Sequence, residues 1–365
     1  MMSRYNVGGT AQWLYQLGMG LQENQIQNIL LIGECQSGEL EDSRIGELNF
    51  VRIEGLGPKT SILKTFLALL HIRKEIKRFR PEIVNTHTSK AGALGRIAAL
   101  TVKPRPRIIH TYHGHVLSGY FGASQAFAVK TIEKILSLFT DYFFVSGQQV
   151  LQDIRNANII RKNNFYKVWP SVPDFDIQDR ALTRLKYGIA PEKLVVGWLG
   201  RKVQIKRIDR ILELAHRNSN VTFIIAGDGN LSDLDYLKSI PVDDNVIELG
   251  FTKPSEMWSI CDICIITSDN EAIPISPIEA ALAKVPLIAL DAGSTREVLI
   301  NGKTGILCAK ESDDLFLALQ KLIGNKKLRL EMGEAARNFV LSKFAPSEAV
   351  QHQIAGYRAV LERSI

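Results

Sequence analysis

The chain has 365 residues, of which 45% are hydrophobic and 23% are charged, as in an ordinary globular protein. This length favours two domains, each with its own core. No apolar run reaches the roughly 18 residues that span a bilayer, and no signal peptide opens the chain. The four cysteines are too few and too scattered for a disulfide scaffold, so we expect a cytoplasmic protein.

Positive charge is concentrated in one region of the chain. The net charge is +7, but residues 59–110 contain twelve Lys or Arg and only two Glu, so they carry +10 and the remainder −3. The densest part, Arg73–Arg80, ends a predicted amphipathic helix. The apolar face of this helix is predicted to run through Ile62, Phe66, Leu69, Leu70 and Ile76. The region is either a solvated helical face or a surface that attracts an anionic membrane or a diphosphate-linked acceptor. Nucleic acid is not expected as a partner, because no recognition motif accompanies the charge.

The chain opens in a predicted loop, Met1–Gly9, and Thr10 then caps an amphipathic helix. A doubly wound domain normally begins with a central strand that leads into such a loop. No residues remain here to form it, so either the sequence begins late or the first sheet lacks its central strand. A late start is the better interpretation, because the strands on either side would otherwise have unpaired backbone groups.

Strand-like runs alternate with helix-length segments along the whole chain, which is typical of parallel α/β sheets. The first half has predicted strands at residues 28–32, 50–53, 83–87, 107–112 and 142–145, and the second at 195–199, 221–226, 246–249, 262–267, 286–289 and 305–308. The proline-rich segment Trp169–Asp176 is the predicted linker. We therefore expect two Rossmann-like doubly wound α/β domains, residues 1–170 and 171–345, facing each other across a cleft.

The most informative segment carries two glutamates, Glu271 and Glu279, eight positions apart. It follows a predicted buried strand and leads into an alanine-rich helix, so it lies at a strand's carboxyl end, where open α/β sheets bind ligands. Ser276 is the predicted N-cap, and the amides after it are free for an anion. Carboxylates suit sugar hydroxyls and amides suit phosphate, so the segment indicates a sugar nucleotide. A glutamate that only complements the helix dipole is the alternative.

Four further turns lie where a ligand could bind. Gly9 opens a helix at a glycine pair that either approaches a phosphate or forms a tight turn. Arg201 and Lys206 follow a strand and would meet a diphosphate, unless they belong to a solvated basic loop. Gly227 would let a nucleoside base approach the backbone at another strand end. The fourth turn, residues 291–297, repeats the pattern after the strand at 286–289.

One histidine and one pair of cysteines are further candidates for a site. His113, in the strand-end segment His110–His115, is placed for chemistry, although any histidine there could be a hydrogen-bonding core residue. Cys261 and Cys264 form a CxxC pair without a second pair or a histidine cluster. Two core cysteines are therefore the better interpretation than a zinc site.

Together these motifs resemble the retaining, nucleotide-sugar-dependent glycosyltransferases of family four (glycosyl transferases group 1), which have the GT-B fold. The resemblance covers almost the whole chain, and the two spaced glutamates are its most specific part. The other matching segments are Gly8–Gly9, Pro81–His87, Thr111–Gly114, Phe144–Ser146, Gly200–Lys206, Ala226–Gly229, Gly250–Phe251 and Gly302–Gly305. In this family the last helix crosses back to the first domain, so residues 346–365 are expected to belong with residues 1–170.

The resemblance also implies a role for each candidate residue. Glu279 would hold the ribose hydroxyls and Glu271 the donor sugar, while Arg201 and Lys206 would neutralise the diphosphate leaving group. The remaining donor contacts, including the active-site histidine near the transferred sugar, would come from Gly9, His113, Gly227, Ile275 and Ser276. No cofactor or metal is expected. The strings Asp174–Asp176 and Asp233–Asp235 are chance DxD matches, because neither directly follows a strand.

The implied reaction transfers a hexosyl group with retention, through a short-lived oxocarbenium-like species. The expected acceptor is lipid-linked or a saccharide, in cell-envelope polysaccharide or glycolipid synthesis at the cytoplasmic membrane face. Ala272 and Lys284 stand where the family usually has glycine, and the linker lacks the usual Asn-Gly. A nucleotide-sugar epimerase of the same fold and an inactive truncated relative remain as alternatives.

Overall fold

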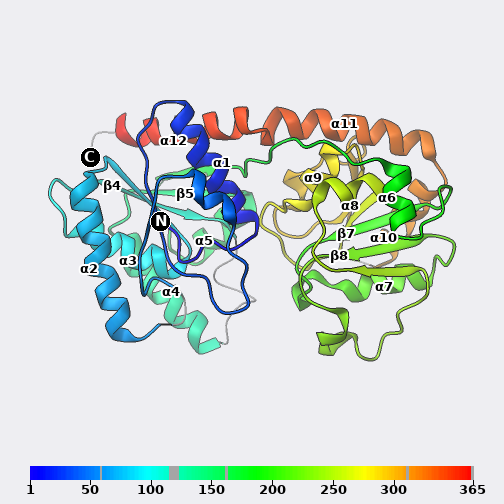
Figure 1. Ribbon diagram of the computed structural model, residues 1–365, viewed down its shortest axis with the longest axis horizontal. Coiled ribbons are helices and arrows are strands. Elements are labelled where there is room, and N and C mark those ends of the chain that lie inside the picture. The colour runs from blue at the N-terminus through cyan, green and yellow to red at the C-terminus, as the bar shows by residue number, and fades with distance from the viewer. Residues whose placement is uncertain (58–59, 115–122, 161–162, 310–311, 363–365) are drawn as a thin grey trace. The chain divides into compact units, whose positions relative to one another are not determined.

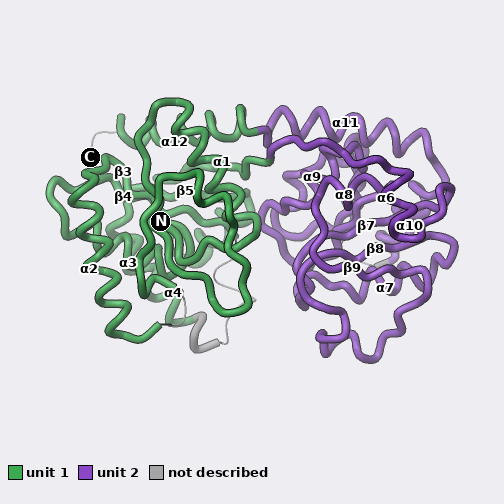
Figure 2. The backbone as a smooth tube through the Cα atoms, viewed as in Figure 1, with its two compact units in different colours: residues 1–172, 346–365 green, residues 173–345 purple. Residues whose placement is uncertain are grey.

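The computed structural model describes residues 1–57, 60–114, 123–160, 163–309 and 312–362. The chain divides into two compact units (Figure 2). Unit 1 comprises Met1–Val172 and Pro346–Ile365, and unit 2 comprises Pro173–Ala345. Both units are built from parallel strands with helices packed against them (Figure 1), so the predicted α/β class is confirmed.

The strands of unit 1 form two separate parallel sheets. A two-stranded sheet pairs β1 (Leu30–Ile32) with β2 (Phe50–Arg52). A four-stranded sheet has the order β3 (Ile83–His87), β4 (Arg107–Tyr112), β5 (Tyr142–Ser146) and β6 (Phe165–Val168). The sequence did not predict β6, because this edge strand has only four residues and its Lys167 is exposed.

The first two residues of the chain lie between these two sheets. Met2 forms a parallel bridge with Ile32 of β1, and the Met1 carbonyl accepts from the His87 N–H of β3 at 2.9 Å. No named strand joins β1 to β3 in the described part of unit 1. Within the described residues, the two sheets of unit 1 are therefore connected through Met1 and Met2 and not through a named strand.

Alternating side chains place two cores on opposite faces of the unit 1 strands. Leu31 and Val84 pack in one cluster with buried residues of α2 (Ile62–Phe79) and α3 (Ser89–Leu100). Ile32 packs in the other cluster with residues of α1 (Gly9–Glu23) and α12 (Pro346–Glu362). The other helices of unit 1 are η1 (Ser43–Glu47), α4 (Ala123–Ser137) and α5 (Gln148–Asn156).

The predicted apolar face of α2 is largely wrong as a core face. Ile62 is 90% exposed and Phe66 is 55% exposed, and Leu70 is also exposed. The face that packs on unit 1 instead runs through Ala68, Ile72 and Ile76. The helix therefore carries apolar side chains on both faces, and periodicity alone did not show which stripe is buried.

Unit 2 contains one six-stranded parallel sheet in the order β12, β11, β10, β7, β8, β9. The strands are β7 (Val195–Leu199), β8 (Thr222–Ala226), β9 (Val246–Leu249), β10 (Ile263–Ile266), β11 (Leu287–Leu290) and β12 (Gly305–Cys308). All six were predicted to within one residue at each end. β10 and β11 are buried along their whole length, because helices cover both faces of the sheet.

The helices of unit 2 lie on both sides of this sheet. Figure 1 shows α7 on the opposite side from α8 and α9. The helices are α6 (Arg180–Lys186), η2 (Gln204–Lys206), α7 (Ile208–His216), η3 (Leu231–Asp233), η4 (Asp235–Leu237), α8 (Pro254–Ile260), α9 (Ser276–Leu282), η5 (Thr295–Glu297), α10 (Ser312–Ile323) and α11 (Lys326–Phe344).

Candidate active site

The loops that carry the predicted donor-binding residues leave neighbouring strands of the unit 2 sheet. β11, β10, β7 and β8 are adjacent and parallel, so their carboxyl ends meet at one edge. The loops after β10 and β7 are joined directly, because the Asp269 N–H donates to the Ile205 carbonyl at 3.0 Å. Thr267 Oγ1 also donates to the Lys206 carbonyl at 2.9 Å. Hydrogen bonds therefore join the loop after β10 to the loop after β7 at this edge of the sheet.

Glu271 lies in the loop between β10 and α9 and is buried. Its Oε1 accepts from Lys206 Nζ at 2.5 Å and from Ser268 Oγ at 2.6 Å. The structure therefore brings together two predicted site residues that stand 65 positions apart in sequence. A charge-assisted bond of this length fixes the carboxylate at the sheet edge with the ammonium beside it.

The loop after β11 holds the backbone of Glu271 in place. The Ser294 N–H donates to the Glu271 carbonyl at 2.9 Å. Gly293 has φ +63°, and a Cβ at this position would lie 2.0 Å from the same carbonyl oxygen. Only glycine fits this approach. Ser294 Oγ is buried beside this loop and has no partner among the described residues, so it is available to a ligand.

Glu279 lies in the first turn of α9 and is buried. Burial raises the pKa of its carboxyl from 4.5 to about 7. No hydrogen bond or ion pair to this carboxylate is found within the described part of the chain. A buried carboxylate without a partner is costly, and ligand hydroxyls would supply the missing donors.

The predicted N-cap at Ser276 is wrong. Ile275 is the N-cap residue, with φ −79° and ψ −43°, and Ser276 is the first residue of α9. Pro277 follows at the second helical position, where its missing N–H costs no hydrogen bond. No side chain caps α9. The Ile278 and Glu279 N–H groups donate to the Ile275 carbonyl, so the Ser276 N–H is the first-turn amide that keeps its capacity to donate.

Arg201 and Gly227 lie on the loops after β7 and β8. Arg201 is exposed, and its guanidinium has no hydrogen bond or ion pair to any described residue. Gly227 has φ +125°, and a Cβ there would lie 1.9 Å from the Gly200 carbonyl oxygen. Glycine is therefore required at this position by the close approach of the two strand-end turns.

Lys202 is a structural cation that the sequence analysis missed. Its side chain is fully buried, and its Nζ donates to the carbonyls of Gly227, Gly229 and Leu249 at 2.9 Å each. Glu248 Oε1 is 3.3 Å away. This lysine ties together the turns after three strands. Its only sequence signal was a lysine in the turn after a strand, next to the more conspicuous Arg201.

His113 and Gly9 belong to unit 1, whereas the other seven predicted site residues belong to unit 2. His113 Nε2 is 2.7 Å from His87 Nδ1, and its ring packs edge-on against Trp13 with centroids 4.7 Å apart. Burial lowers the pKa of His113 to about 3, so the ring is neutral at pH 7. Its Nδ1 is buried without a partner among the described residues, which leaves one ring nitrogen for a ligand.

Gly9 is the first residue of α1 and is exposed. No side chain caps this helix, so its first-turn amides can donate to an anion. His87, which orients His113, was recognised only as part of a family motif. His115 lies outside the described residues, so its placement carries no argument.

No group of three or more metal-ligating side chains occurs in the described ranges. Cys261 and Cys264 are both buried thiols, in keeping with their interpretation as core residues. Among the described helices, none has the length and apolar character needed to cross a bilayer.

Comparison with solved structures defines the fold class of this protein. The structure of Anabaena Alr3699/HepE in complex with UDP and glucose superposes with a TM-score of 0.81, at 18% identity, over 98% of each chain. With its two parallel-sheet units, the protein thus has the fold of the GT-B glycosyltransferases.

The family follows from the sequence matches. Residues 7–170 match the family described as Glycosyltransferase Family 4, and residues 179–339 match Glycosyl transferases group 1. The chain belongs to glycosyltransferase family 4.

Two curated relatives indicate the biological setting in which similar chains act. The capsular polysaccharide biosynthesis glycosyltransferase CapM of Staphylococcus aureus is 24% identical over 319 residues, which is 83% of this chain and 82% of the relative. The UDP-Gal:alpha-D-GlcNAc-diphosphoundecaprenol alpha-1,3-galactosyltransferase of Escherichia coli is 24% identical over 329 residues, 85% of this chain and 83% of the relative. The distant homologues thus include one named for capsular polysaccharide biosynthesis and one whose name gives a UDP-sugar donor.

Proposed function

We propose that this protein is a retaining glycosyltransferase that moves a hexosyl group from a uridine diphosphate sugar to a lipid-linked or saccharide acceptor. The product would belong to a cell-envelope polysaccharide or glycolipid. The observation that carries the proposal is the ion pair of Lys206 with Glu271 at the carboxyl edge of the unit 2 sheet, followed by the buried, unpartnered Glu279 in the first turn of α9. The choice of uridine rests on the UDP-Gal donor named for the Escherichia coli relative and on the UDP named in the superposed structure.

The proposed donor roles follow from charge and burial. The unpartnered Glu279 carboxylate accepts the ribose hydroxyls, and Glu271 accepts hydroxyls of the transferred sugar. Lys206 and Arg201 stabilise the negative charge that develops on the diphosphate as it leaves. Gly227 lets the base approach the backbone, because no side chain fits between this turn and Gly200.

The remaining proposed contacts come from backbone amides and from one neutral ring. The uncapped first turns at Ile275–Ser276 and at Gly9 donate to the phosphates or the sugar. His113 is too weak a base to carry charge at pH 7, so it acts as a hydrogen-bonding partner of the transferred sugar. With cations supplied by the chain itself, the reaction needs no metal.

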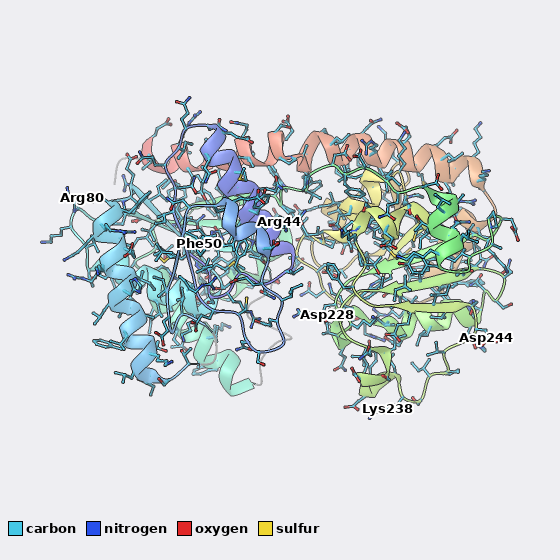
Figure 3. The ribbon with its side chains drawn as sticks, in the orientation of Figure 1. Arg44, Phe50, Arg80, Asp228, Lys238 and Asp244 are labelled. Atoms are coloured by element: carbon cyan, nitrogen blue, oxygen red, sulfur yellow. The ribbon has the colours of Figure 1, made fainter. Side chains whose placement is uncertain are left out.

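The surface that we propose for the membrane is formed by the exposed apolar and basic side chains of α2 and α4, here called the α2–α4 surface. Both helices pack against α3. The exposed apolar members are Ile62, Leu63, Phe66, Leu67, Leu70, Phe127, Ile132 and Ile135. Arg80, at the end of α2, points away from unit 1 (Figure 3), and Lys74 and Lys77 are exposed on the same helix. Apolar side chains with flanking cations suit the cytoplasmic face of an anionic membrane. Lys59, the first residue of the basic region, lies outside the described residues.

A transfer assay tests the proposed reaction. The protein is incubated with each of several UDP-sugars and with polyprenyl-diphosphate sugars or free saccharides, with and without EDTA, and products are analysed by mass spectrometry and anomeric NMR. We expect an α-linked product from an α-linked donor, at the same rate in EDTA. Epimerised donor formed without acceptor would instead identify an epimerase. If calorimetry detects no binding of any nucleoside diphosphate, and Glu279→Ala changes nothing, the proposal is overturned.

A further inference from the structure

The C-terminal helix α12 contributes a buried amide side chain to unit 1. α12 packs against α1, and its Gln353 is only 1% exposed. Gln353 Oε1 accepts from the Trp13 indole N–H of α1 at 3.0 Å. Gln353 Nε2 donates to the Tyr357 hydroxyl, one turn further along α12, also at 3.0 Å. Both ends of the amide thus have a partner, as a buried polar group requires.

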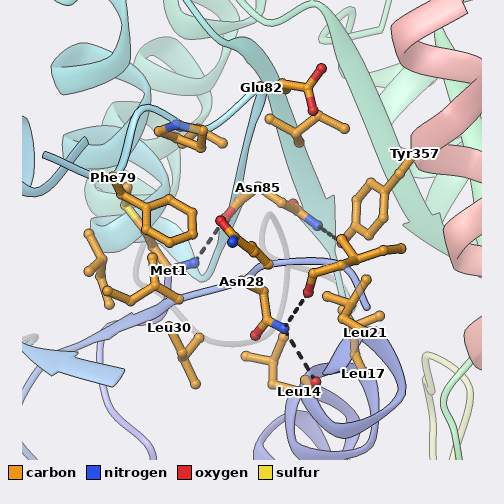
Figure 4. A pocket seen from close by; sticks show the side chains of 18 of the residues that line it. Met1, Leu14, Leu17, Leu21, Asn28, Leu30, Phe79, Glu82, Asn85 and Tyr357 are labelled. Carbon is orange, nitrogen blue, oxygen red and sulfur yellow. Dashed lines mark hydrogen bonds between the residues drawn. The ribbon is translucent and has the colours of Figure 1, made fainter. Parts of the chain in front are cut away.

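The chemistry of these partners fixes the orientation of the amide. The indole N–H of Trp13 can only donate, so Gln353 Oε1 must face it and Nε2 then faces Tyr357. The Tyr357 hydroxyl also accepts from Asn85 Nδ2 at 2.8 Å (Figure 4). Asn85 Oδ1 in turn accepts from Thr111 Oγ1 at 2.8 Å. Because Asn85 lies on β3 and Thr111 on β4, hydrogen bonds connect Gln353 to the four-stranded sheet.

The other face of this arrangement is the contact of Trp13 with His113. The two ring planes lie at 84° to each other, and the indole is 5% exposed. On its other neighbour, His87, the His113 ring is stacked with centroids 4.9 Å apart and planes at 28°. Two aromatic rings therefore hold the imidazole whose buried Nδ1 has no partner among the described residues. A rotation of the indole would change the direction of this Nδ1.

The hydrogen bond to Gln353 selects one orientation of the indole. The χ2 torsion of a tryptophan has a broad, roughly two-fold preference, so packing of the flat ring does not by itself fix the side of the N–H. A turned indole would leave its N–H and the Gln353 oxygen buried without partners. Each such group loses its hydration without compensation, so the turned state is strongly disfavoured.

We propose that Gln353 is a positioning residue for sugar transfer, because its hydrogen bond holds the Trp13 indole in the orientation that aims His113 at the transferred sugar. This inference rests on the proposed function, in which His113 is a hydrogen-bonding partner of that sugar. Gln353 acts through Trp13 and not on the substrate. The bond joins residues 340 positions apart, so the C-terminal helix takes part in shaping the unit 1 portion of the site.

The test separates the Trp13 bond from the other bond of the same glutamine. Gln353→Met removes the acceptor with little change in side-chain volume, whereas Gln353→Glu keeps an oxygen for the indole N–H. Tyr357→Phe is the matched control, since it removes the second partner of Gln353 and leaves the Trp13 bond in place. Gln353→Met is also combined with Trp13→Phe, which has no indole N–H. Each protein is measured for kcat and KM in the transfer assay, for UDP affinity by calorimetry and for melting temperature.

We expect Gln353→Met to lower kcat about tenfold or more, because a displaced contact to the reacting group is costly in rate. UDP affinity is expected to stay unchanged. Gln353→Glu and Tyr357→Phe are expected to keep kcat within about threefold of the parent. When Trp13→Phe is already present, Gln353→Met is expected to have almost no further effect on kcat, because the two residues act as a unit.

Three results would overturn the proposal. The first is a parent-like kcat in Gln353→Met, and the second is an equal loss of kcat in Tyr357→Phe. The third is a tenfold loss in Gln353→Glu, which still offers an acceptor to Trp13; this variant decides the question if Gln353→Met does not fold.

A second readout does not depend on activity. NMR of the protein labelled with [15N]histidine reports the tautomer and the mobility of the His113 ring, whose signals are identified by their loss in His113→Asn. We expect these signals to shift or broaden in Gln353→Met and to match the parent in Tyr357→Phe. A parent protein without transfer activity would refute the proposed function, whereas unchanged His113 signals in Gln353→Met would refute the positioning role.

Discussion

At the scale of single residues, burial sets the ionisation of Glu279. Its carboxyl has a pKa of about 7 in the folded protein and 4.5 as its ordinary value. The folded state therefore binds this proton more tightly than the unfolded state does. The resulting stabilisation is fully present below about pH 4.5, and it is lost as the pH rises through 7.

Replacement of Glu279 by glutamine removes this pH dependence. Because glutamine imitates the protonated acid, Glu279→Gln is expected to unfold with the same free energy as the parent near pH 4.5. At pH 8 it is expected to be more stable by about 3 kcal/mol. Urea denaturation across this pH range measures the difference. A variant that is destabilised equally at every pH would contradict the assignment of the shift to Glu279.

Lys206 is the residue whose loss tests the leaving-group role. Lys206→Met removes the ammonium beside Glu271, and kcat/KM for sugar transfer is expected to fall by about 10²–10³-fold. The matched control is Lys238→Met, since Lys238 is exposed and directly follows η4 (Figure 3). A comparable loss in both variants would remove Lys206 from the proposed machinery. Circular dichroism would confirm that each variant is folded.

The sequence was sufficient to place the two glutamates in a segment at a strand's carboxyl end, because strand-end loops are recognisable from local pattern. The ion pair between Glu271 and Lys206 was not predictable, since it joins loops from two strands that become neighbours only in the folded sheet. Lys202 was missed for the same reason. Its three carbonyl partners lie at the ends of two other strands, β8 and β9, and no local pattern marks them.

At the scale of elements, the end of α9 has a strained position. Lys284 stands where the family usually has glycine, and it lies just beyond the helix with φ +60°. A left-handed conformation costs a residue with a Cβ roughly 1–2 kcal/mol. Lys284, which replaces the usual glycine of the family, therefore has a backbone conformation that glycine adopts freely.

Lys284→Gly is expected to stabilise the protein by up to about 1 kcal/mol, since relief of strain exceeds the entropic cost of glycine. The substitution also removes the ion pair of Lys284 with Glu334, but this pair is exposed and contributes little to the free energy of unfolding. Chemical denaturation measures the change. Lys253→Gly, at a position with φ −67°, is the control and is expected to be neutral or destabilising. Destabilisation by both changes would show that Lys284 is not strained.

At the scale of the whole molecule, charge and exposed apolar surface coincide on one set of helices. The region 59–110 carries +10 although the chain carries +7. α2, which lies in this region, has five exposed large apolar residues. Either feature alone has ordinary explanations, but both together fit adsorption to an anionic membrane.

Vesicle sedimentation tests this surface. The protein is expected to sediment with phosphatidylglycerol vesicles at 50 mM salt, and less at 500 mM because the Debye length shortens. The double change Phe66→Ser and Leu67→Ser is expected to weaken binding at least tenfold with an unchanged melting temperature, since both side chains are exposed. Leu330→Ser on α11, an equally exposed leucine, is the control. Equal binding to neutral phosphatidylcholine vesicles would contradict the proposal.

The sequence by itself determined the α/β class, the positions of most strands and the loops that carry the candidate site. These properties follow from local patterns, namely apolar runs, alternation and glycine turns at strand ends. Only the tertiary structure decided which stripe of α2 is buried and which cation pairs with Glu271. Those properties depend on contacts between residues that are distant in sequence. The packing of the whole chain decides which of these residues become buried next to one another.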